Sequence, residues 1–273
     1  QVSDMAQRMA QAQPAANIEG LSDADGACTR NKLTQLLANR HGKLVGYKAG
    51  LTNVAVQKRF NTDRPVWGKL YESMLLTNGA SVPAQYAARP VFESDLLVRV
   101  SSDRINQART PEEVLAAIDQ VIPFIELPDL VVEAPMKLNG AGVAAINVGA
   151  RLGVMGEPIA TPAGSAERQV LLDALRDMSV VVSDGSGAVL NTTKGSAILD
   201  HPLNAVVWLA QALAQEGLAM KPGELIERGI GGFQFRGEAI KLAQHPDHVP
   251  IGLLRKTALK RAVEPGQIIT FDD

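Results

Sequence analysis

The sequence predicts a mixed α/β domain built on a curved, largely antiparallel β-sheet with flanking helices. Short apolar stretches bounded by glycine and proline have the length and composition of strands, and segments with helical periodicity lie among them. The two kinds of segment do not alternate regularly, which favours an antiparallel arrangement. A chain of 273 residues is long enough for one large domain, or for one domain with a small appendage.

The first part of the chain predicts two helices, one strand and a further short helix. Residues 1–20 are polar and rich in Gln and Ala, so we expect a loose helix or a partly disordered segment. Residues 25–41 carry leucines at helical spacing and are predicted to form a helix. A short strand at 43–49, broken by Gly50, precedes a short helix at 54–60.

The middle of the chain predicts strands separated by glycine and proline, followed by one well-marked helix. The strand candidates are 68–76, 81–82 and 91–100. Thr110 is a good N-cap, Pro111 suits the first helical position, and Glu113 can complete a capping box. This helix is predicted to run to about Gln120, and Glu126 then lies on the next strand.

The last part of the chain predicts a strand, two helices and a hairpin. The corresponding segments are a strand region at 144–154, a helix at 166–178 and a hairpin at 180–190 that turns at 184–187. His201 or Asp200 caps a long helix with Pro202 in its first turn, and Gly217 ends it. Short strands and turns are expected after Gly223.

Composition excludes several classes of function. The 27 basic and 29 acidic residues nearly cancel, and there is no basic run, so a nucleic-acid partner is not expected. No apolar stretch approaches the roughly 20 residues that cross a bilayer, so we expect no membrane segment. One cysteine, Cys28, cannot form an internal disulfide or a thiolate metal cluster. We expect a cytoplasmic protein, or a periplasmic or secreted one if Gln1 follows a removed signal peptide.

Three carboxylates occur where carboxylates are costly. Glu93 and Asp95 lie two residues apart in one apolar stretch, and Glu126 lies within another. Alternation along a strand places Glu93 and Asp95 on the same face. Buried carboxylates are usually paired or bound to a cation, and no basic partner is obvious here. Three hard oxygen ligands therefore predict a Mg²⁺ or Mn²⁺ site, although the alternative of a solvated charge pair stays open for Glu93 and Asp95.

Other residues are candidates for proton transfer or substrate binding. Lys48 ends a short apolar strand between glycines, where burial and a nearby metal would lower its pKa and make it a usable acid or base. Its alternative is a surface lysine. The candidate substrate-binding residues are Thr52, Lys194, Gly195, Ser196 and His201. His201 is most simply explained as a helix cap. No nucleophile motif of the Gly-x-Ser-x-Gly type occurs.

Several motifs occur together in the order of a known family. They are GYKAGLT at 46–52, VQ at 56–57, DRPVWG at 63–68, ESD at 93–95, PFIE at 123–126, GS at 195–196 and HPLNAVVWL at 201–209. With these motifs the chain resembles, over about residues 25–229, the 2-hydroxypenta-2,4-dienoate hydratase and 4-oxalocrotonate decarboxylase group of the fumarylacetoacetase superfamily. The resemblance implies a fumarylacetoacetase C-terminal-like fold at about 25–228, after an N-terminal extension at 1–24.

The resemblance also implies a function. A Mg²⁺ or Mn²⁺ ion held by Glu93, Asp95 and Glu126 would chelate a small 2-oxo or 2-hydroxydienoic acid, and Lys48 would move a proton during ketonisation. The leading hypothesis is a hydratase-like lyase of aromatic-compound catabolism that adds water after enolisation. Alternatives are a 2-oxo acid decarboxylase, an acylpyruvate-type C–C hydrolase, or a non-catalytic 2-oxo acid binding protein. A homo-oligomer is expected from the same resemblance.

Three positions depart from the family pattern. Val66 replaces an Asp, the stretch 147–149 lacks a Ser, and Arg228 replaces the Thr that precedes Gly229. The lost Asp and Ser are polar groups expected to position or activate water, so decarboxylation and binding alone stay open. The segment 229–273 resembles a SAF-type β-clip module at 249–253 and 259–273. A natural fusion, an engineered join and a divergent end of the same domain are the alternatives for this segment.

Overall fold

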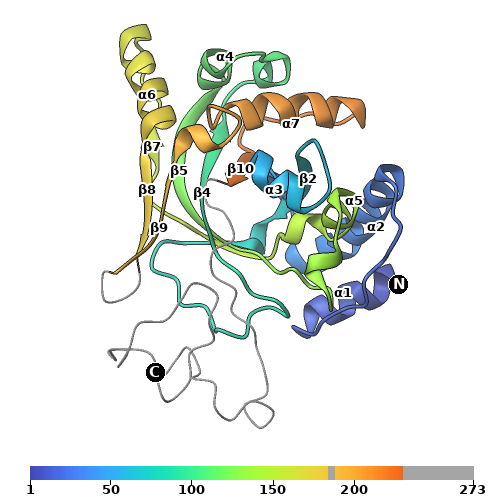
Figure 1. Ribbon diagram of the computed structural model, residues 1–273. Helices are drawn as coiled ribbons and strands as arrows, with labels where there is room; N and C mark the ends of the chain where they lie inside the picture. The colour runs from blue at the N-terminus through green and yellow to red at the C-terminus, as the bar shows by residue number, and fades with distance from the viewer. Residues whose placement is uncertain (184–187, 230–273) are drawn as a thin grey trace.

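A curved sheet forms the centre of the computed structural model, which describes residues 1–183 and 188–229 (Figure 1). Its strand order is β2-β1-β10-β4-β5-β6-β3, and β7 pairs with β5. The strands are β1 (Leu44–Gly50), β2 (Val66–Tyr71), β3 (Leu75–Leu76), β4 (Glu93–Val100), β5 (Ile118–Leu127), β6 (Leu152–Met155), β7 (Ile159–Ala160) and β10 (Leu225–Gly229). Only β1 with β10 and β3 with β6 pair in parallel within this sheet, which confirms the predicted mixed, largely antiparallel class.

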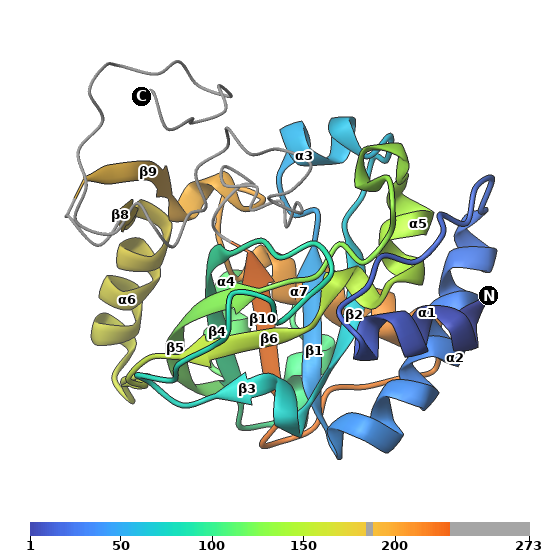
Figure 2. The ribbon, with the colours of Figure 1, turned by 90° about the horizontal axis from the view of Figure 1, so that it is seen from below.

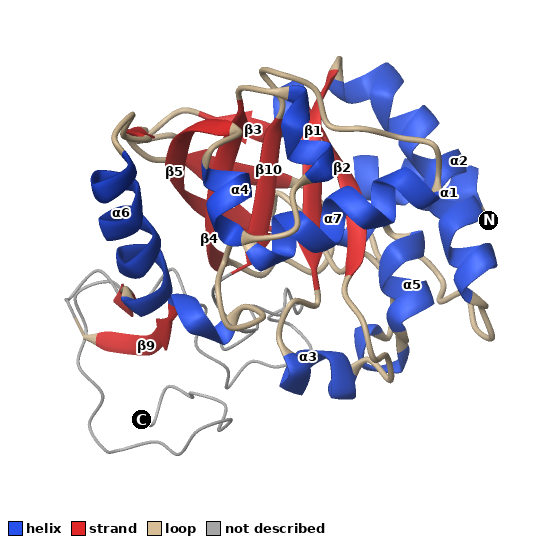
Figure 3. Ribbon diagram, turned by 90° about the horizontal axis from the view of Figure 1, so that it is seen from above, coloured by secondary structure: helices blue, strands red, loops and turns tan. Residues whose placement is uncertain are grey.

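Helices flank this sheet, and a separate hairpin lies at one side. The helices are α1 (Val2–Ala10), α2 (Asp23–His41), α3 (Val54–Arg59), α4 (Pro111–Leu115), α5 (Gly140–Ala145), α6 (Ser165–Asp177) and α7 (Asn204–Gln215). Helix α6 and the hairpin of β8 (Ser179–Ser183) and β9 (Val189–Lys194) lie on the side of the molecule away from α1 and α2 (Figure 1). Figure 3 shows α7 crossing the strands at the middle of the sheet.

The two faces of the sheet bury two separate hydrophobic clusters. Because side chains alternate along a strand, β4 sends Leu96 and Val98 to the face that packs against α7, and Leu97 to the other face. We call these the α7 face and the α2 face. The α2 face meets α2 through Leu33 and Leu37, and it is the side turned toward the viewer in Figure 2, with α7 behind the sheet. Strands in the middle of this sheet are therefore buried on both sides.

Most predicted elements are confirmed, with small shifts at their ends. The N-terminal segment forms α1, whose Met5 and Met9 belong to the cluster on the α2 face. Helix α2 begins two residues before the predicted start, because Ser22 caps it and Asp25 closes a capping box. Thr110 caps α4 as predicted, accepting a hydrogen bond from the backbone of Glu113.

Three predictions of secondary structure are wrong. The helix from Thr110 ends at Leu115 rather than near Gln120, because the apolar residues from Ile118 onward pair with β4 instead. The region 144–154 is a strand only from Leu152. Asn147 and Val148 both have a φ of 55°, which no strand accommodates, and the side chain of Asn147 exchanges two hydrogen bonds with the backbone of Lys69. The pair 81–82 forms no strand.

Some predictions lie outside the described residues. They are the hairpin turn at 184–187 and, beyond Gly229, the segment predicted to be divergent or SAF-like. The division into extension, catalytic domain and C-terminal segment therefore stays a prediction. Within the described ranges, no helix has both the length and the apolar character that a bilayer crossing requires.

Candidate metal and substrate site

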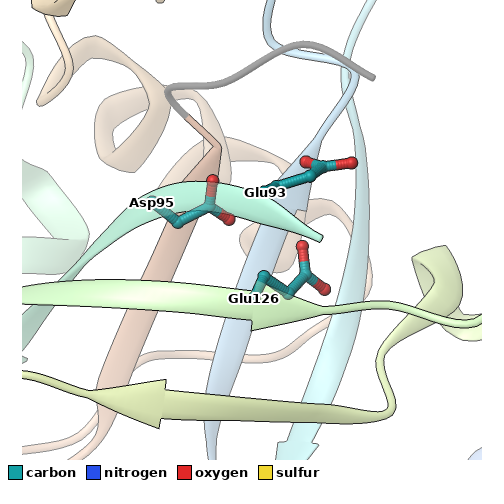
Figure 4. Close-up of side chains that lie close together, drawn as sticks. All are labelled: Glu93, Asp95 and Glu126. Atoms are coloured by element: carbon teal, nitrogen blue, oxygen red, sulfur yellow. The ribbon is translucent and has the colours of Figure 1, made fainter. Parts of the chain in front are cut away.

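The three predicted carboxylates come together on the α2 face of the sheet. Glu93 and Glu126 are opposite each other in the β4–β5 ladder, and Asp95 follows two residues along β4 on the same face. One oxygen from each residue lies within 4.8 Å of the others. Figure 4 shows the three side chains extending from the same side of the two strands. The period-two spacing therefore produces the cluster that it predicts.

This donor set fits a divalent cation. Asp95 and Glu126 are buried, at 4% and 3% exposure, and Glu93 is partly buried. Burial, followed by the negative charge of Glu126, raises the pKa of Glu93 to about 8. Gathered carboxylates that resist ionisation are the usual counterpart of a hard cation, because the cation removes the repulsion and restores the lost solvation.

Lys48 is the basic partner of Glu126. It lies on β1 at 3% exposure and forms an ion pair with the Glu126 carboxylate. The inference that the three acids have no basic partner is therefore wrong. Burial lowers the pKa of Lys48, but the charges of Glu126, Glu227 and Glu93 raise it more, so its net pKa lies well above the ordinary value. The expected lowering of this pKa does not occur, and Lys48 is held as an ammonium.

A fourth buried carboxylate, Glu227, was not predicted to belong to the site. It lies on β10 beside Lys48 in the β1–β10 register, and its Oε1 is 3.3 Å from the Lys48 Nζ. Burial and the charge of Glu126 raise the pKa of Glu227 well above its ordinary value. If residues 225–229 formed a strand at the edge of the sheet, their charged side chains would be exposed to solvent. Glu227 is buried because β10 lies between β1 and β4 at the centre of the sheet, and no local pattern in the sequence indicates that place.

A cavity of about 260 Å³ opens beside these charges. Lys48, Glu93 and Glu126 form one end of it. Its other walls are mainly apolar, and they include Leu51, Val56, Phe60, Leu130, Val143, Val148 and Ile198. The wall formed by α3 is positioned by Asn53, which caps that helix, and by Gln57, which donates a hydrogen bond to the Leu51 carbonyl.

Gly50 is required for the close packing of this cavity wall. A Cβ at this position would lie 2.3 Å from Cγ1 of Val148, so only glycine allows the two segments to meet. The strand that carries Lys48 is thereby fixed against the turn at 147–149. That turn occupies the stretch in which the family pattern has a serine.

The predicted substrate-binding residues are placed differently from one another. Thr52 lines the cavity. Lys194, Gly195 and Ser196 do not line it, although Thr193 and Ala197 on either side do. His201 is not among the lining residues either. Its Nδ1 accepts a hydrogen bond from the Leu203 backbone N–H, and its Nε2 lies 3.1 Å from the Leu172 carbonyl oxygen.

The prediction that His201 or Asp200 caps the following helix is wrong, because α7 begins at Asn204 and its N-cap residue is Leu203, with no side-chain capping bond. His201 instead has a structural role in the turn before α7. A ring that accepts at Nδ1 and donates at Nε2 is neutral, and burial lowers the His201 pKa in the same direction. Val66 also lies apart from the cavity. It lines a separate hollow of about 310 Å³ between α2, α5 and α7.

Comparison with known proteins gives clear relatives. The chain is 30% identical over 192 residues to a 2-keto-4-pentenoate hydratase of Paraburkholderia xenovorans (strain LB400), with 70% of this chain and 67% of that protein covered. It is 28% identical over 207 residues to a 4-oxalocrotonate decarboxylase of Pseudomonas putida, with 76% and 74% covered. No protein-family model matches the chain.

Solved structures include a similar fold. A 4-oxalocrotonate decarboxylase from Pseudomonas putida G7, complexed with magnesium and adipate, superposes with a TM-score of 0.71 at 25% identity. The superposition covers 85% of this chain and 88% of the other. The likeness therefore extends over most of the chain.

Proposed function

The chain belongs to the 2-keto-4-pentenoate hydratase family, and on that premise we propose that it is a metal-dependent lyase acting on a small 2-oxo or 2-hydroxydienoic acid. The observation that carries this proposal is the buried group of Glu93, Asp95 and Glu126 beside Lys48, at one end of a cavity with mainly apolar walls. The group has the ligands for a hard cation, a proton carrier and space for a small acid.

Glu93, Asp95 and Glu126 would hold a Mg²⁺ or Mn²⁺ ion. When bound, such an ion supplies Lewis-acid chemistry toward the carboxylate and 2-oxo oxygens of the substrate. Lys48 stands at the same end of the cavity as an ammonium, so it can give a proton to the dienol carbon during ketonisation and recover one later. The apolar walls exclude bulk water from the carbon chain of the substrate.

The walls favour a substrate with one carboxylate. Among the lining residues described, Lys48 is the only basic one, and it lies at the acidic end. A second carboxylate of the substrate that lay against the apolar lining, for example against Phe60 or Leu130, would lose its solvation. A hydratase-like reaction on a monocarboxylic dienoate therefore fits better than decarboxylation of a dicarboxylate.

Decarboxylation is the second candidate, and one observation favours it. Val148 lines the cavity, while the polar side chain of Asn147 is occupied by the backbone of Lys69. The described walls near this turn thus offer little to orient an attacking water, and loss of CO₂ needs none. The same observation supports a binding protein that retains the fold without turnover.

The remaining properties are also proposals. The partner is a small-molecule 2-oxo acid, and a homo-oligomer is what the family resemblance of the sequence implies. We place the protein in the cytoplasm, with a periplasmic or secreted location as the alternative.

The decisive experiment follows the ultraviolet absorbance of 2-hydroxypenta-2,4-dienoate with Mg²⁺ and then with EDTA. We expect metal-dependent loss of the dienoate that falls by about 10²- to 10⁴-fold in Lys48→Ala, because a positioned acid–base group contributes that much. Lys43→Ala is the matched control, since Lys43 is exposed just before the same strand.

The outcomes separate the candidates. Loss of the dienoate with formation of the hydrated product identifies a hydratase, whereas CO₂ release from 4-oxalocrotonate without dienoate loss identifies a decarboxylase. Binding of oxalate or pyruvate with no turnover of either substrate would leave only the binding protein. Metal-independent turnover would refute the proposed role of the three carboxylates.

A further inference from the structure

Lys48 has two carboxylate partners, and they have different roles. Strands β1 and β10 run in parallel with Lys48 beside Glu227, so both side chains extend from the α2 face of the sheet. The Lys48 Nζ lies 3.3 Å from Glu227 Oε1 and is also paired with Glu126. All three side chains are at least 96% buried. Water therefore contributes little to holding the ammonium in place.

Glu227 is not one of the three proposed cation ligands, although it is in contact with one of them, Glu126. Glu93, Asp95 and Glu126 bring oxygens within 4.8 Å of one another, and Glu227 does not join that group. The ion pair of Glu227 is the one with Lys48, and its side chain also interacts with that of Glu126. Glu227 therefore lies beside both the lysine and Glu126, outside the three residues that would hold the cation.

Cation binding would change the surroundings of Lys48. A divalent ion that uses the Glu126 oxygens competes with the ammonium for them and also repels it at short range. A buried ammonium without a counter-ion is very unfavourable, so it would move away or lose its proton. Glu227 is the partner that stays available when Glu126 serves the cation.

We propose that Glu227 is a positioning residue, which holds the Lys48 ammonium in the cavity while Glu126 binds the cation. The inference rests on the proposed function, since it concerns the proton carrier of that reaction. Glu227 does not line the cavity, so it acts through Lys48 and not on the substrate.

The next residue, Arg228, balances the charge that Glu227 adds. Arg228 extends toward the α7 face, is fully buried, and interacts electrostatically with Asp95. The four carboxylates of the site, with Lys48 and Arg228, leave a formal excess of two negative charges. One divalent cation cancels that excess. Because Glu227 and Arg228 carry opposite formal charges, the two together do not change the net charge that a bound cation would balance.

The experiment uses this pairing to separate position from charge. Glu227→Gln removes one negative charge, and the double variant Glu227→Gln with Arg228→Met restores the formal balance. Mn²⁺ affinity is measured by electron paramagnetic resonance. Proton transfer is measured with Mg²⁺ by NMR, as exchange of the C3 protons of 2-oxopentanoate in D₂O, a reaction that requires no hydration step. Glu224→Gln is the matched control, because Glu224 lies just before β10 and interacts with Lys221 instead.

We expect the double variant to bind Mn²⁺ within about threefold of the wild-type affinity, yet to exchange at least about tenfold more slowly at saturating metal. Wild-type exchange in that variant would overturn the proposal, because charge balance alone would then suffice. Should the double variant not fold, Glu227→Asp keeps the charge but shortens the reach. Exchange as fast as wild type in that variant equally contradicts the positioning role.

Failure of the proposed function gives a different result. Wild-type protein that binds Mn²⁺ but supports neither exchange nor dienoate loss removes the hydratase hypothesis, and this inference with it. Wild-type protein that exchanges, with Glu227 variants that exchange equally well, removes only the inference.

Discussion

Two groups of buried charge in this protein are balanced in different ways. In the hollow between α2 and α7, the buried Arg30 donates hydrogen bonds of 2.5 and 2.7 Å to the two oxygens of Glu216, and its guanidinium lies 3.4 Å from the centre of the Trp67 ring. One positive and one negative charge cancel there. The group around Lys48 instead has a formal excess of two negative charges when its four carboxylates are all ionised.

The difference indicates which of the two groups is suited to bind a cation and take part in a reaction. An ion pair stacked on an aromatic ring has a partner for each of its charges, and it stabilises the packing of α2 against α7. In the group around Lys48, burial and the charge of Glu126 raise the pKa values of Glu93 and Glu227. A bound cation would stabilise these carboxylates in their ionised form. Arg30 and Lys48 are both buried, so the burial of the basic residue does not distinguish the two groups, but their charge balance does.

The largest effect is expected when a carboxylate is removed from the unbalanced group. Glu126→Gln keeps the shape of the side chain but removes one proposed ligand, so we expect Mn²⁺ affinity to fall by at least about 10- to 100-fold without unfolding. Titration monitored by electron paramagnetic resonance, together with circular dichroism, measures both quantities. Asp119→Asn is the matched control on the same strand, because Asp119 pairs with Arg99 at the opposite end of β5. Wild-type affinity in Glu126→Gln would remove Glu126 from the site.

The pH dependence of stability gives a second, smaller effect. The pKa of Glu93 rises from 4.5 to about 8 in the folded protein without metal. Between these values the folded protein binds more protons than the unfolded chain, so its free energy of unfolding falls as pH rises. We expect the Tm without metal to decrease between about pH 5 and pH 9, and saturating Mg²⁺ to reverse much of that decrease.

Differential scanning calorimetry with Mg²⁺ and with EDTA measures this difference. Glu93→Gln is the control, since it should flatten the slope recorded without metal. Equal slopes with and without Mg²⁺ would show that the cation does not replace the proton on this group.

The sequence predicts the parts of the site that depend on local pattern. The two-residue spacing of Glu93 and Asp95 is enough to place them on one face of a strand, and the apolar neighbours of Glu126 are enough to indicate burial. The Lys48 contact with Glu126 joins residues 78 positions apart, so it depends on strand order, which local pattern does not specify. Glu227 was missed for the same reason, because its burial follows from the place of β10 between β1 and β4.

The errors in secondary structure have a related cause. The helix predicted to reach Gln120 ends early because residues from Ile118 onward gain a ladder with β4, and no local signal announces that ladder. The turn at 147–149 replaces a predicted strand because Asn147 is held by the backbone of Lys69 on a distant strand. Both errors arise where tertiary contacts outweigh local preference.

The smallest effect on metal binding is expected from the balanced group. Arg30→Met removes the ion pair and the ring contact while keeping the length of the side chain, and Glu216, at 29% side-chain exposure, can then turn to water. We expect a loss of about 2 kcal/mol in the free energy of unfolding, as for a hydrogen-bonded charged group, with Mn²⁺ affinity within about twofold of wild type. Urea denaturation and Mn²⁺ titration of the same sample test the two parts. A large fall in Mn²⁺ affinity without unfolding would mean that the two charge groups are coupled through the sheet. The route would be the adjacent strands β1 and β2, which carry Lys48 and Trp67. The distinction between a balanced and an unbalanced group would then fail.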